Sequence, residues 1–135
     1  MSVDENAPMG SIVSDSSRPV DAIVVVEDDL VLQVLIADIV TESGTHCHAF
    51  TTCDEALQYL LDGNPCQAVI TDHGVPGKLQ GLDLLVEVQE RWPAVHGVLT
   101  SGYDLADLTL PPNCVYLPKP WTLIALLAAL GNCPP

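Results

Sequence analysis

The sequence predicts a single α/β domain in which helices cover both faces of a doubly wound, five-stranded parallel sheet. Two observations carry this prediction. Short apolar runs recur along the chain, and continuous runs of this kind are typical of strands buried on both faces. Longer stretches with apolar residues at helical spacing lie between them, and such alternation favours a parallel sheet. The length of 135 residues fits one domain.

The chain opens with a segment, residues 1–19, that we expect to be a flexible tail because Ser, Asp, Pro and Gly dominate it. The domain itself is expected to span 20–133. Residues 22–26 read AIVVV and predict the first strand. Apolar residues at helical spacing then predict a helix from Asp29 to Ser43, and the glycine that follows is typical of a helix end.

The second unit begins with a predicted strand at 46–50. Thr52 is followed three residues later by Glu55, which is the signature of a capping box at a helix start. We expect this helix to end near the Gly-Asn-Pro sequence at 63–65. The apolar run at 67–71 then predicts the third strand.

Asp72 ends the third strand, and a loop containing Gly and Pro follows it. The next helix is predicted at 82–91, where a proline soon stops it. Residues 97–100 predict the fourth strand, and 103–110 a short fourth helix. The fifth strand is predicted at 114–117.

The last helix is predicted at 122–130, with Gly131 at its end. It is apolar around almost its whole circumference, so its large side chains cannot all face one sheet. Those left exposed would form a candidate dimer or partner surface. The alternative is that neighbouring loops cover them.

Composition excludes several classes of function. The net charge of −14, with only four scattered Lys and Arg, argues against direct nucleic-acid binding. Five cysteines without a Cys-x-x-Cys pair favour reduced thiols over a zinc site or a disulfide framework. No apolar run reaches the ~18 residues of a membrane span, and no signal peptide is evident. We therefore expect a cytoplasmic protein without a membrane partner.

Polar and charged residues follow four of the five predicted strands, at the end where sheets of this kind bind ligands. They are the triplet Glu27-Asp28-Asp29, Asp72, the pair Thr100-Ser101, and Lys119. Each alone is more commonly a cap, a turn or a solvated residue. Their coincidence at four strand ends indicates one common site.

The chemistry of such a site follows from its charges. Clustered carboxylates raise each other's pKa unless a cation screens them, and hard oxygen ligands suit Mg²⁺. Asp72 is the candidate nucleophile for attack on phosphorus. The Lys119 ammonium would neutralise charge on the transferring phosphoryl group, and Thr100 would donate a hydrogen bond to it.

From about residue 21 to 131, the chain resembles the response-regulator receiver family of two-component signalling. The matching segments are IVVVEDD at 23–29, AVITD at 68–72 with Pro76 four residues later, VLTSGY at 98–103, and YLPKP at 116–120. The resemblance implies a flavodoxin-like receiver fold with strand order 2-1-3-4-5. It also implies Mg²⁺ bound by the acidic pair Glu27 and Asp28, by Asp72, and by the backbone carbonyl of Gly74.

The same resemblance implies a signalling role. Asp72 would be the phosphoacceptor, Lys119 the phosphate partner, Thr100 the switch hydroxyl and Tyr116 the switch aromatic. The phosphoryl group would come from a sensor histidine kinase or a His-phosphotransfer protein. A downstream protein, or a second copy in a homodimer, would bind the face formed by the fourth helix, fifth strand and last helix. The domain would catalyse only its own phosphorylation and dephosphorylation, so it would not be an enzyme in the ordinary sense.

Three departures and two alternatives accompany this interpretation. The loop from Asp72 to Gly81 is one residue longer than usual, Gly74 brings no side chain, and Trp121 replaces a common phenylalanine. A small-molecule phosphatase or phosphotransferase of the haloacid-dehalogenase type is one alternative, although such enzymes have a second Asp where Gly74 stands. A degenerate receiver that only binds proteins is the other, and the intact acceptor set counts against it. Because the chain ends four residues after Gly131, we expect no output domain, in either a stand-alone regulator or a receiver from a hybrid kinase.

Overall fold

The computed structural model of the protein describes residues 22–103 and 108–131. Its elements are β1 (Ala22–Val26), α1 (Leu30–Glu42), β2 (His46–Phe50), α2 (Cys53–Leu61), β3 (Ala68–Asp72), α3 (Gly81–Arg91), β4 (His96–Ser101), β5 (Cys114–Pro118) and α4 (Leu123–Gly131). The tail expected at 1–19 and the middle of the helix expected at 103–110 lie outside the described residues. Residues 108–110, the last three of that expected helix, are described and are not helical.

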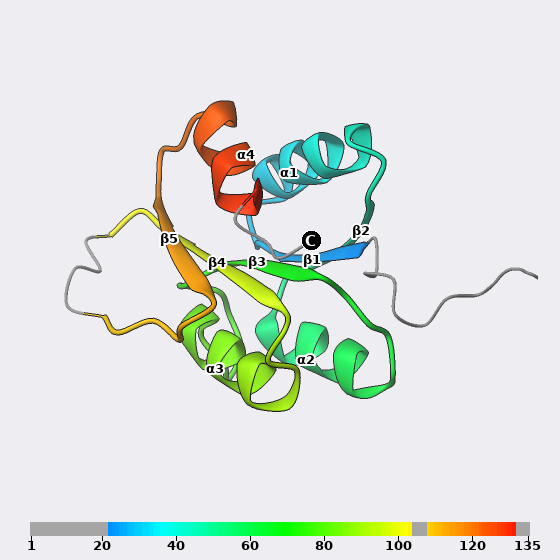
Figure 1. The fold of residues 1–135 in the computed structure, drawn as a ribbon. Helices are drawn as coiled ribbons and strands as arrows, with labels where there is room; N and C mark the ends of the chain where they lie inside the picture. The colour runs from blue at the N-terminus through cyan, green and yellow to red at the C-terminus, as the bar shows by residue number, and fades with distance from the viewer. Residues whose placement is uncertain (1–21, 104–107, 132–135) are drawn as a thin grey trace, which may run out of the picture.

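The five strands form one parallel sheet in the order β2-β1-β3-β4-β5, which confirms the predicted topology. Helices α1 and α4 cover one face, and α2 and α3 cover the other (Figure 1). Because every strand runs the same way, their carboxyl ends lie along one edge. In the register of the sheet, Asp72 is paired with Thr100 of the neighbouring strand.

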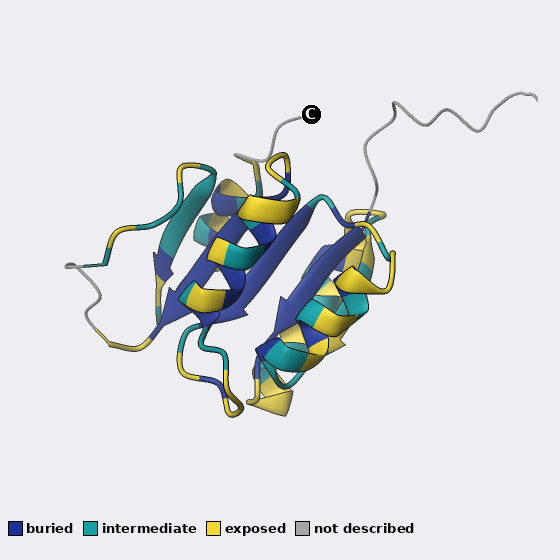
Figure 2. Ribbon diagram, turned by 90° about the horizontal axis from the view of Figure 1, so that it is seen from below, coloured by how far each residue is buried: buried dark blue, intermediate teal, exposed yellow. Residues whose placement is uncertain are grey.

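Alternating side chains of the strands build two cores, one on each face. In β1, Val24 and Val26 pack toward α2 and α3, whereas Ile23 and Val25 pack toward α1 and α4. All five residues of β1 and of β3 are buried, which explains why their sequences are apolar without alternation (Figure 2). The cores therefore fix the sheet from both sides and hold its carboxyl edge in place.

Side chains cap the starts of α1 and α2. The Asp29 carboxylate accepts hydrogen bonds from the backbone N–H groups of Val31 and Leu32, at 3.0 and 3.2 Å. Thr52 Oγ1 accepts the N–H of Glu55 at 3.1 Å and donates to the Glu55 carboxylate. Both contacts satisfy N–H groups that a helix start leaves without partners.

Strand β4 starts one residue earlier than the apolar pattern predicted, at His96. This polar side chain is buried because its two ring nitrogens have partners, Asn113 Oδ1 at 3.2 Å and the Ala129 carbonyl at 3.0 Å. A buried polar group with such partners avoids the cost of lost hydration. His96 thereby ties β4 to α4.

Candidate functional site

Three carboxylates meet at the carboxyl edge of the sheet. Glu27 and Asp28 directly follow β1, and Asp72 ends β3. One oxygen from each of the three lies within 4.8 Å of the others. Glu27 is only 2% exposed and Asp72 is buried, whereas Asp28 is open to solvent. This set of hard oxygen donors, partly open to water, fits a divalent cation of the Mg²⁺ type.

Lys119 joins two of these acids. Its Nζ lies 3.0 Å from Glu27 Oε1 and 3.1 Å from Asp72 Oδ1. The backbone N–H of Lys119 donates to the Ser101 carbonyl at 2.8 Å, which fixes the segment beyond β5 against the end of β4. The ammonium therefore offsets negative charge at Asp72 and is a fixed cation for any anion bound there.

Burial and charge shift the pKa of both partners. Burial raises the pKa of the Glu27 carboxyl, although hydrogen bonds from the Asp29 N–H and from Lys119 lower it, and the charge of Asp72 adds to the increase. Burial lowers the pKa of Lys119, but its hydrogen bonds to Glu27 and Asp72 outweigh this effect and raise it. The raised pKa means that the ionised form of Glu27 is less favourable in the folded protein than in the unfolded chain.

We predict that Glu27→Gln stabilises the metal-free protein at neutral pH, because the amide removes a desolvated charge and its repulsion with Asp72, while Lys119 keeps Asp72 as its partner. A raised carboxyl pKa means that the fold loses stability as pH rises through that pKa, so the advantage of the variant should disappear in acid. Urea unfolding at several pH values, with a chelator present, measures this. A Glu27→Gln protein that is less stable than the parent at neutral pH would contradict it.

Gln33 positions the acidic segment, a role that we did not predict from the sequence. Its Nε2 donates to the Glu27 carbonyl at 3.0 Å and to the Phe50 carbonyl at 3.1 Å, while the Glu27 N–H donates to the same Phe50 carbonyl. The amide thereby joins the ends of β1 and β2. The sequence does mark this residue, because Gln33 is the lone amide within the otherwise apolar first turns of α1.

Thr100 and Tyr116 occupy neighbouring strands near the acids. Thr100 is buried beside Asp72, and its carbonyl accepts the His73 N–H at 2.9 Å. Tyr116 is half-buried, and its hydroxyl donates to the Tyr103 carbonyl at 2.8 Å. Tyr116 is thus linked to the segment that follows β4, not to the acids themselves.

The loop that follows Asp72 is tethered to α2. The Asp54 carboxylate in the first turn of α2 accepts the Lys78 N–H at 2.9 Å. Gly77 has a φ of 109°, in the region that favours glycine, and a Cβ there would collide with the Asp54 carboxylate. Gly74 lies at the exposed start of this loop, and the next residue, Val75, is buried in the core. The loop is therefore anchored by one carboxylate and one glycine.

Gly77→Ala should lower the free energy of unfolding by about 2 kcal/mol, since it combines an unfavourable φ with displacement of the Asp54 carboxylate from the Lys78 N–H. Gly63→Ala is the matched control, because Gly63 has a φ of 98° but open space around it. Gly63→Ala should lower the free energy of unfolding by only ~1 kcal/mol, the effect of the unfavourable φ alone. Urea denaturation measures both, and equal losses would show that the Asp54 contact does not constrain residue 77.

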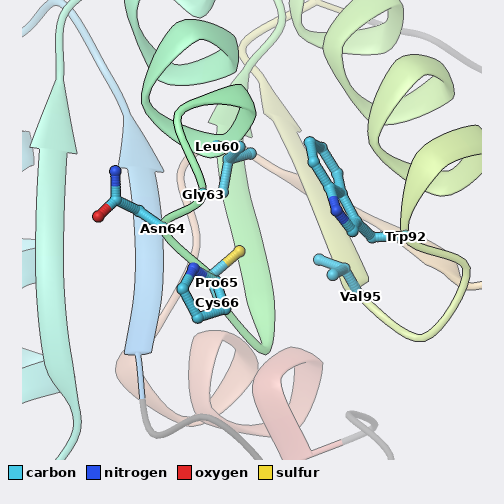
Figure 3. A pocket seen from close by; sticks show the side chains of 7 residues that line it. All are labelled: Leu60, Gly63, Asn64, Pro65, Cys66, Trp92 and Val95. Carbon is cyan, nitrogen blue, oxygen red and sulfur yellow. The ribbon is translucent and has the colours of Figure 1, made fainter.

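A pocket of about 180 Å³ lies at the opposite end of the sheet, and Figure 3 shows the side chains that line it. The pocket is lined by Leu60, Gly63, Asn64, Pro65, Cys66, Trp92 and Val95. Burial raises the pKa of the Cys66 thiol to about 12, so this sulfur stays protonated and unreactive. Because Cys66 and Val95 lie just before β3 and β4, the pocket is remote from the acid cluster.

Two curated proteins are similar in sequence to parts of this chain. The chain is 37% identical over 76 residues to the hydrogenase transcriptional regulatory protein HoxA of Cupriavidus necator, covering 53% of this chain and 15% of that one. It is 27% identical over 112 residues to the DNA-binding transcriptional regulator NtrC of Proteus hauseri, covering 78% and 23%. The chain thus spans under a quarter of either relative. No family model matches it.

Solved structures share the fold closely. A response regulator receiver protein from Sinorhizobium medicae has a TM-score of 0.79 at 22% identity, over 83% of this chain and 92% of that one. A response regulator receiver domain from Clostridium thermocellum has a TM-score of 0.74 at 26% identity, with the same coverage. The response regulator TrrA of Thermotoga maritima, solved in complex with Mg²⁺ and BeF, has a TM-score of 0.70 at 23% identity, over 84% and 98%.

Among the described residues, no helix is both long and apolar enough to cross a membrane.

Proposed function

We propose that this chain, which is similar in fold and sequence to the response-regulator receiver domains, accepts a phosphoryl group on Asp72 and changes conformation to signal to a partner protein. One observation carries the proposal. The Asp72 carboxylate lies at a strand end together with Glu27 and Asp28, and the Lys119 ammonium contacts it at 3.1 Å. A nucleophile, a cation site and a fixed positive charge are the requirements of phosphoryl transfer.

Each residue has a distinct role in this proposal. A carboxylate oxygen of Asp72 forms a bond to phosphorus as the bond from phosphorus to the donor breaks. Glu27, Asp28, Asp72 and the Gly74 carbonyl would hold Mg²⁺, which when bound supplies positive charge to the phosphoryl oxygens. Lys119 neutralises a further phosphoryl oxygen, and the Thr100 hydroxyl donates to another.

The proposed donor is a sensor histidine kinase or a His-phosphotransfer protein, and the receiver catalyses only transfer to and loss from its own aspartate. Its proposed location is the cytoplasm, which agrees with the free thiols of Cys47, Cys53, Cys66 and Cys114. NtrC is DNA-binding by name, but this chain spans only 23% of it. We propose no direct nucleic-acid contact for this chain itself, because it has four Lys and Arg against 18 acids.

The proposed switch couples Asp72 to β5. A phosphoryl group would draw Thr100 toward its oxygens, and the space vacated would favour an inward position of Tyr116, whose hydroxyl would leave the Tyr103 carbonyl. The face affected includes β5, α4 and the segment between β4 and β5. It is the proposed surface for a downstream partner or a homodimer.

Beryllofluoride with Mg²⁺ should imitate the phosphorylated state and change hydrogen exchange at 100–110 and 115–117 as well as near Asp72. Thr100→Ala should confine the changes to the neighbourhood of Asp72, because the coupling hydroxyl is absent. Changes confined to that neighbourhood in the unmodified protein would mean that this face does not report phosphorylation.

A further inference from the structure

The pocket between the ends of α2 and α3 has a buried floor and an exposed rim. Leu60, Cys66 and Val95 form the floor and are 4%, 8% and 9% exposed, respectively. Gly63 and Pro65 also line the pocket, and both are exposed. A small molecule can therefore reach the floor from solvent without unfolding of the domain.

Hydrogen bonds of the surrounding backbone hold the walls of this pocket. The Asn64 side chain donates to the Tyr59 carbonyl at 2.9 Å, which fixes the loop after α2. At the end of α3, the Trp92 N–H donates to the Val88 carbonyl at 2.7 Å, and the Val95 N–H donates to the Trp92 carbonyl at 3.0 Å. The pocket is thus formed before any ligand arrives, as most small-molecule sites are.

The lining of the pocket selects an uncharged guest. Among the described residues, no Asp, Glu, Lys, Arg or His lines it, and the Cys66 thiol is protonated. Figure 3 shows Leu60, the Cys66 sulfur and the Trp92 ring around the space, whereas the Asn64 amide points away from it. An ion or a phosphate would lose its hydration there without gaining a partner. Water, too, would find few hydrogen-bond partners on such walls.

The volume and one wall of the pocket narrow the choice further. Apolar protein cavities of about 150 Å³ hold one benzene molecule. This pocket, at about 180 Å³, therefore has room for one six-membered ring with a short substituent. The half-buried indole of Trp92 forms one wall. Aromatic rings attract one another beyond the effect of buried area, so a planar aromatic ring fits better than an aliphatic one.

We propose that this pocket binds a small neutral aromatic molecule, a single ring with at most a short substituent. Cys66 and Val95 lie just ahead of β3 and β4, and these strands carry Asp72 and Thr100 at their other ends. The binding site and the acid cluster therefore lie at opposite edges of the sheet. Binding needs no phosphoryl group on Asp72, so it stands apart from the proposed phosphorylation.

The test uses the full chain and toluene as the probe. Toluene should shift the NMR signals of amides at 63–66 and 92–95 and of the Trp92 indole N–H, and the shifts should saturate. It should also raise the unfolding temperature, because it binds the folded pocket and not the unfolded chain.

Three analogues of similar size test the chemistry of the site. Benzoate and benzylammonium carry opposite charges on the same ring, and each should bind at least about tenfold more weakly than toluene. Methylcyclohexane has no aromatic ring and should bind about threefold or more weakly.

Variants of Cys66 test the location. Cys66→Leu places a larger side chain in the pocket and should weaken toluene binding by about tenfold or more. Cys66→Ala leaves the space open and should bind within about threefold of the parent, since the proposal uses the volume and not the thiol. Cys47→Leu is the matched control, because Cys47 packs against the core on the other face of the sheet, and it should bind toluene normally. Labelling by acetyl phosphate should be equal in all of these proteins.

Several results would overturn the proposal. Shifts centred on the exposed apolar side chains of α1 and α4, instead of on the pocket, would mean that toluene only adsorbs to the surface. Equal binding of toluene and benzoate would remove the selection for a neutral guest, and equal binding of methylcyclohexane would remove the selection for an aromatic one. These comparisons use the unmodified protein, so they decide the matter even if Cys66→Leu does not fold. A folded Cys66→Leu protein with normal toluene affinity would place the ligand elsewhere.

Discussion

Replacing Asp72 with asparagine should abolish uptake of a phosphoryl group from acetyl phosphate, with a loss of about a hundredfold or more in labelling rate. The amide is nearly the same size but has no nucleophilic oxygen with a full charge. Asp72 ends β3, lies within the cluster and contacts Lys119. Intact-mass measurement after incubation with Mg²⁺ reads the result directly.

Glu90→Gln is a suitable control, because Glu90 is an exposed acid of α3 outside the site. It should label like the unmodified protein. Urea unfolding of Asp72→Asn should show that the fold persists, since removing one of several crowded acids relieves repulsion. Equal labelling of Asp72→Asn and the parent would remove Asp72 from the role of acceptor.

The second large effect is on Mg²⁺ binding, and it should distinguish the adjacent acids Asp28 and Asp29. Asp28→Ala should weaken Mg²⁺ binding by about tenfold or more, because it removes one of three clustered carboxylates. Asp29→Ala should leave Mg²⁺ affinity within about threefold but lower the free energy of unfolding by about 1 kcal/mol, because Asp29 caps α1. Calorimetric titration with Mg²⁺ and urea unfolding separate the two.

Each variant is the control for the other, since both remove one charge from the same segment. A larger loss of Mg²⁺ affinity in Asp29→Ala would move the metal site by one residue. An Asp28→Ala protein with normal affinity would mean that Glu27 and Asp72 suffice for the ion.

The sequence predicted the strands well, because they depend on local patterns, and the resemblance to receiver domains implied their order. Buried runs such as AIVVV have one reasonable structure, and the caps at Asp29 and Thr52 are short-range features. The start of β4 predicted at residue 97 was late by one residue because His96 is polar, and only its partners in α4 and at Asn113 explain its burial. Such partners lie far apart in the chain.

The candidate site was predictable as a set of residues but not as a set of contacts. That Glu27, Asp28 and Asp72 lie together follows from strand ends meeting at one edge. The bridge of Lys119 between Glu27 and Asp72 depends on the backbone beyond β5, which no local pattern describes.

Two features outside the acid cluster also depended on the fold. Nothing local marks Asp54 as the partner of the Lys78 N–H, because they are 24 residues apart. The apolar excess of α4 was expected, and the structure confirms that part of it is exposed. The exposed row of α1 was not predicted, since which side of an apolar helix faces the sheet is settled only by packing.

The central claim is tested most directly by trapping the phosphorylated protein with borohydride, which reduces an acyl phosphate at the carbonyl carbon, and locating the altered residue by peptide mass spectrometry. The expected result is reduction at Asp72 alone, seen after incubation with acetyl phosphate and Mg²⁺ and absent when a chelator replaces the metal. Reduction at another acid, or a phosphoryl group on the neighbouring His73 that borohydride leaves intact, would contradict the assignment of Asp72 as the phosphoacceptor.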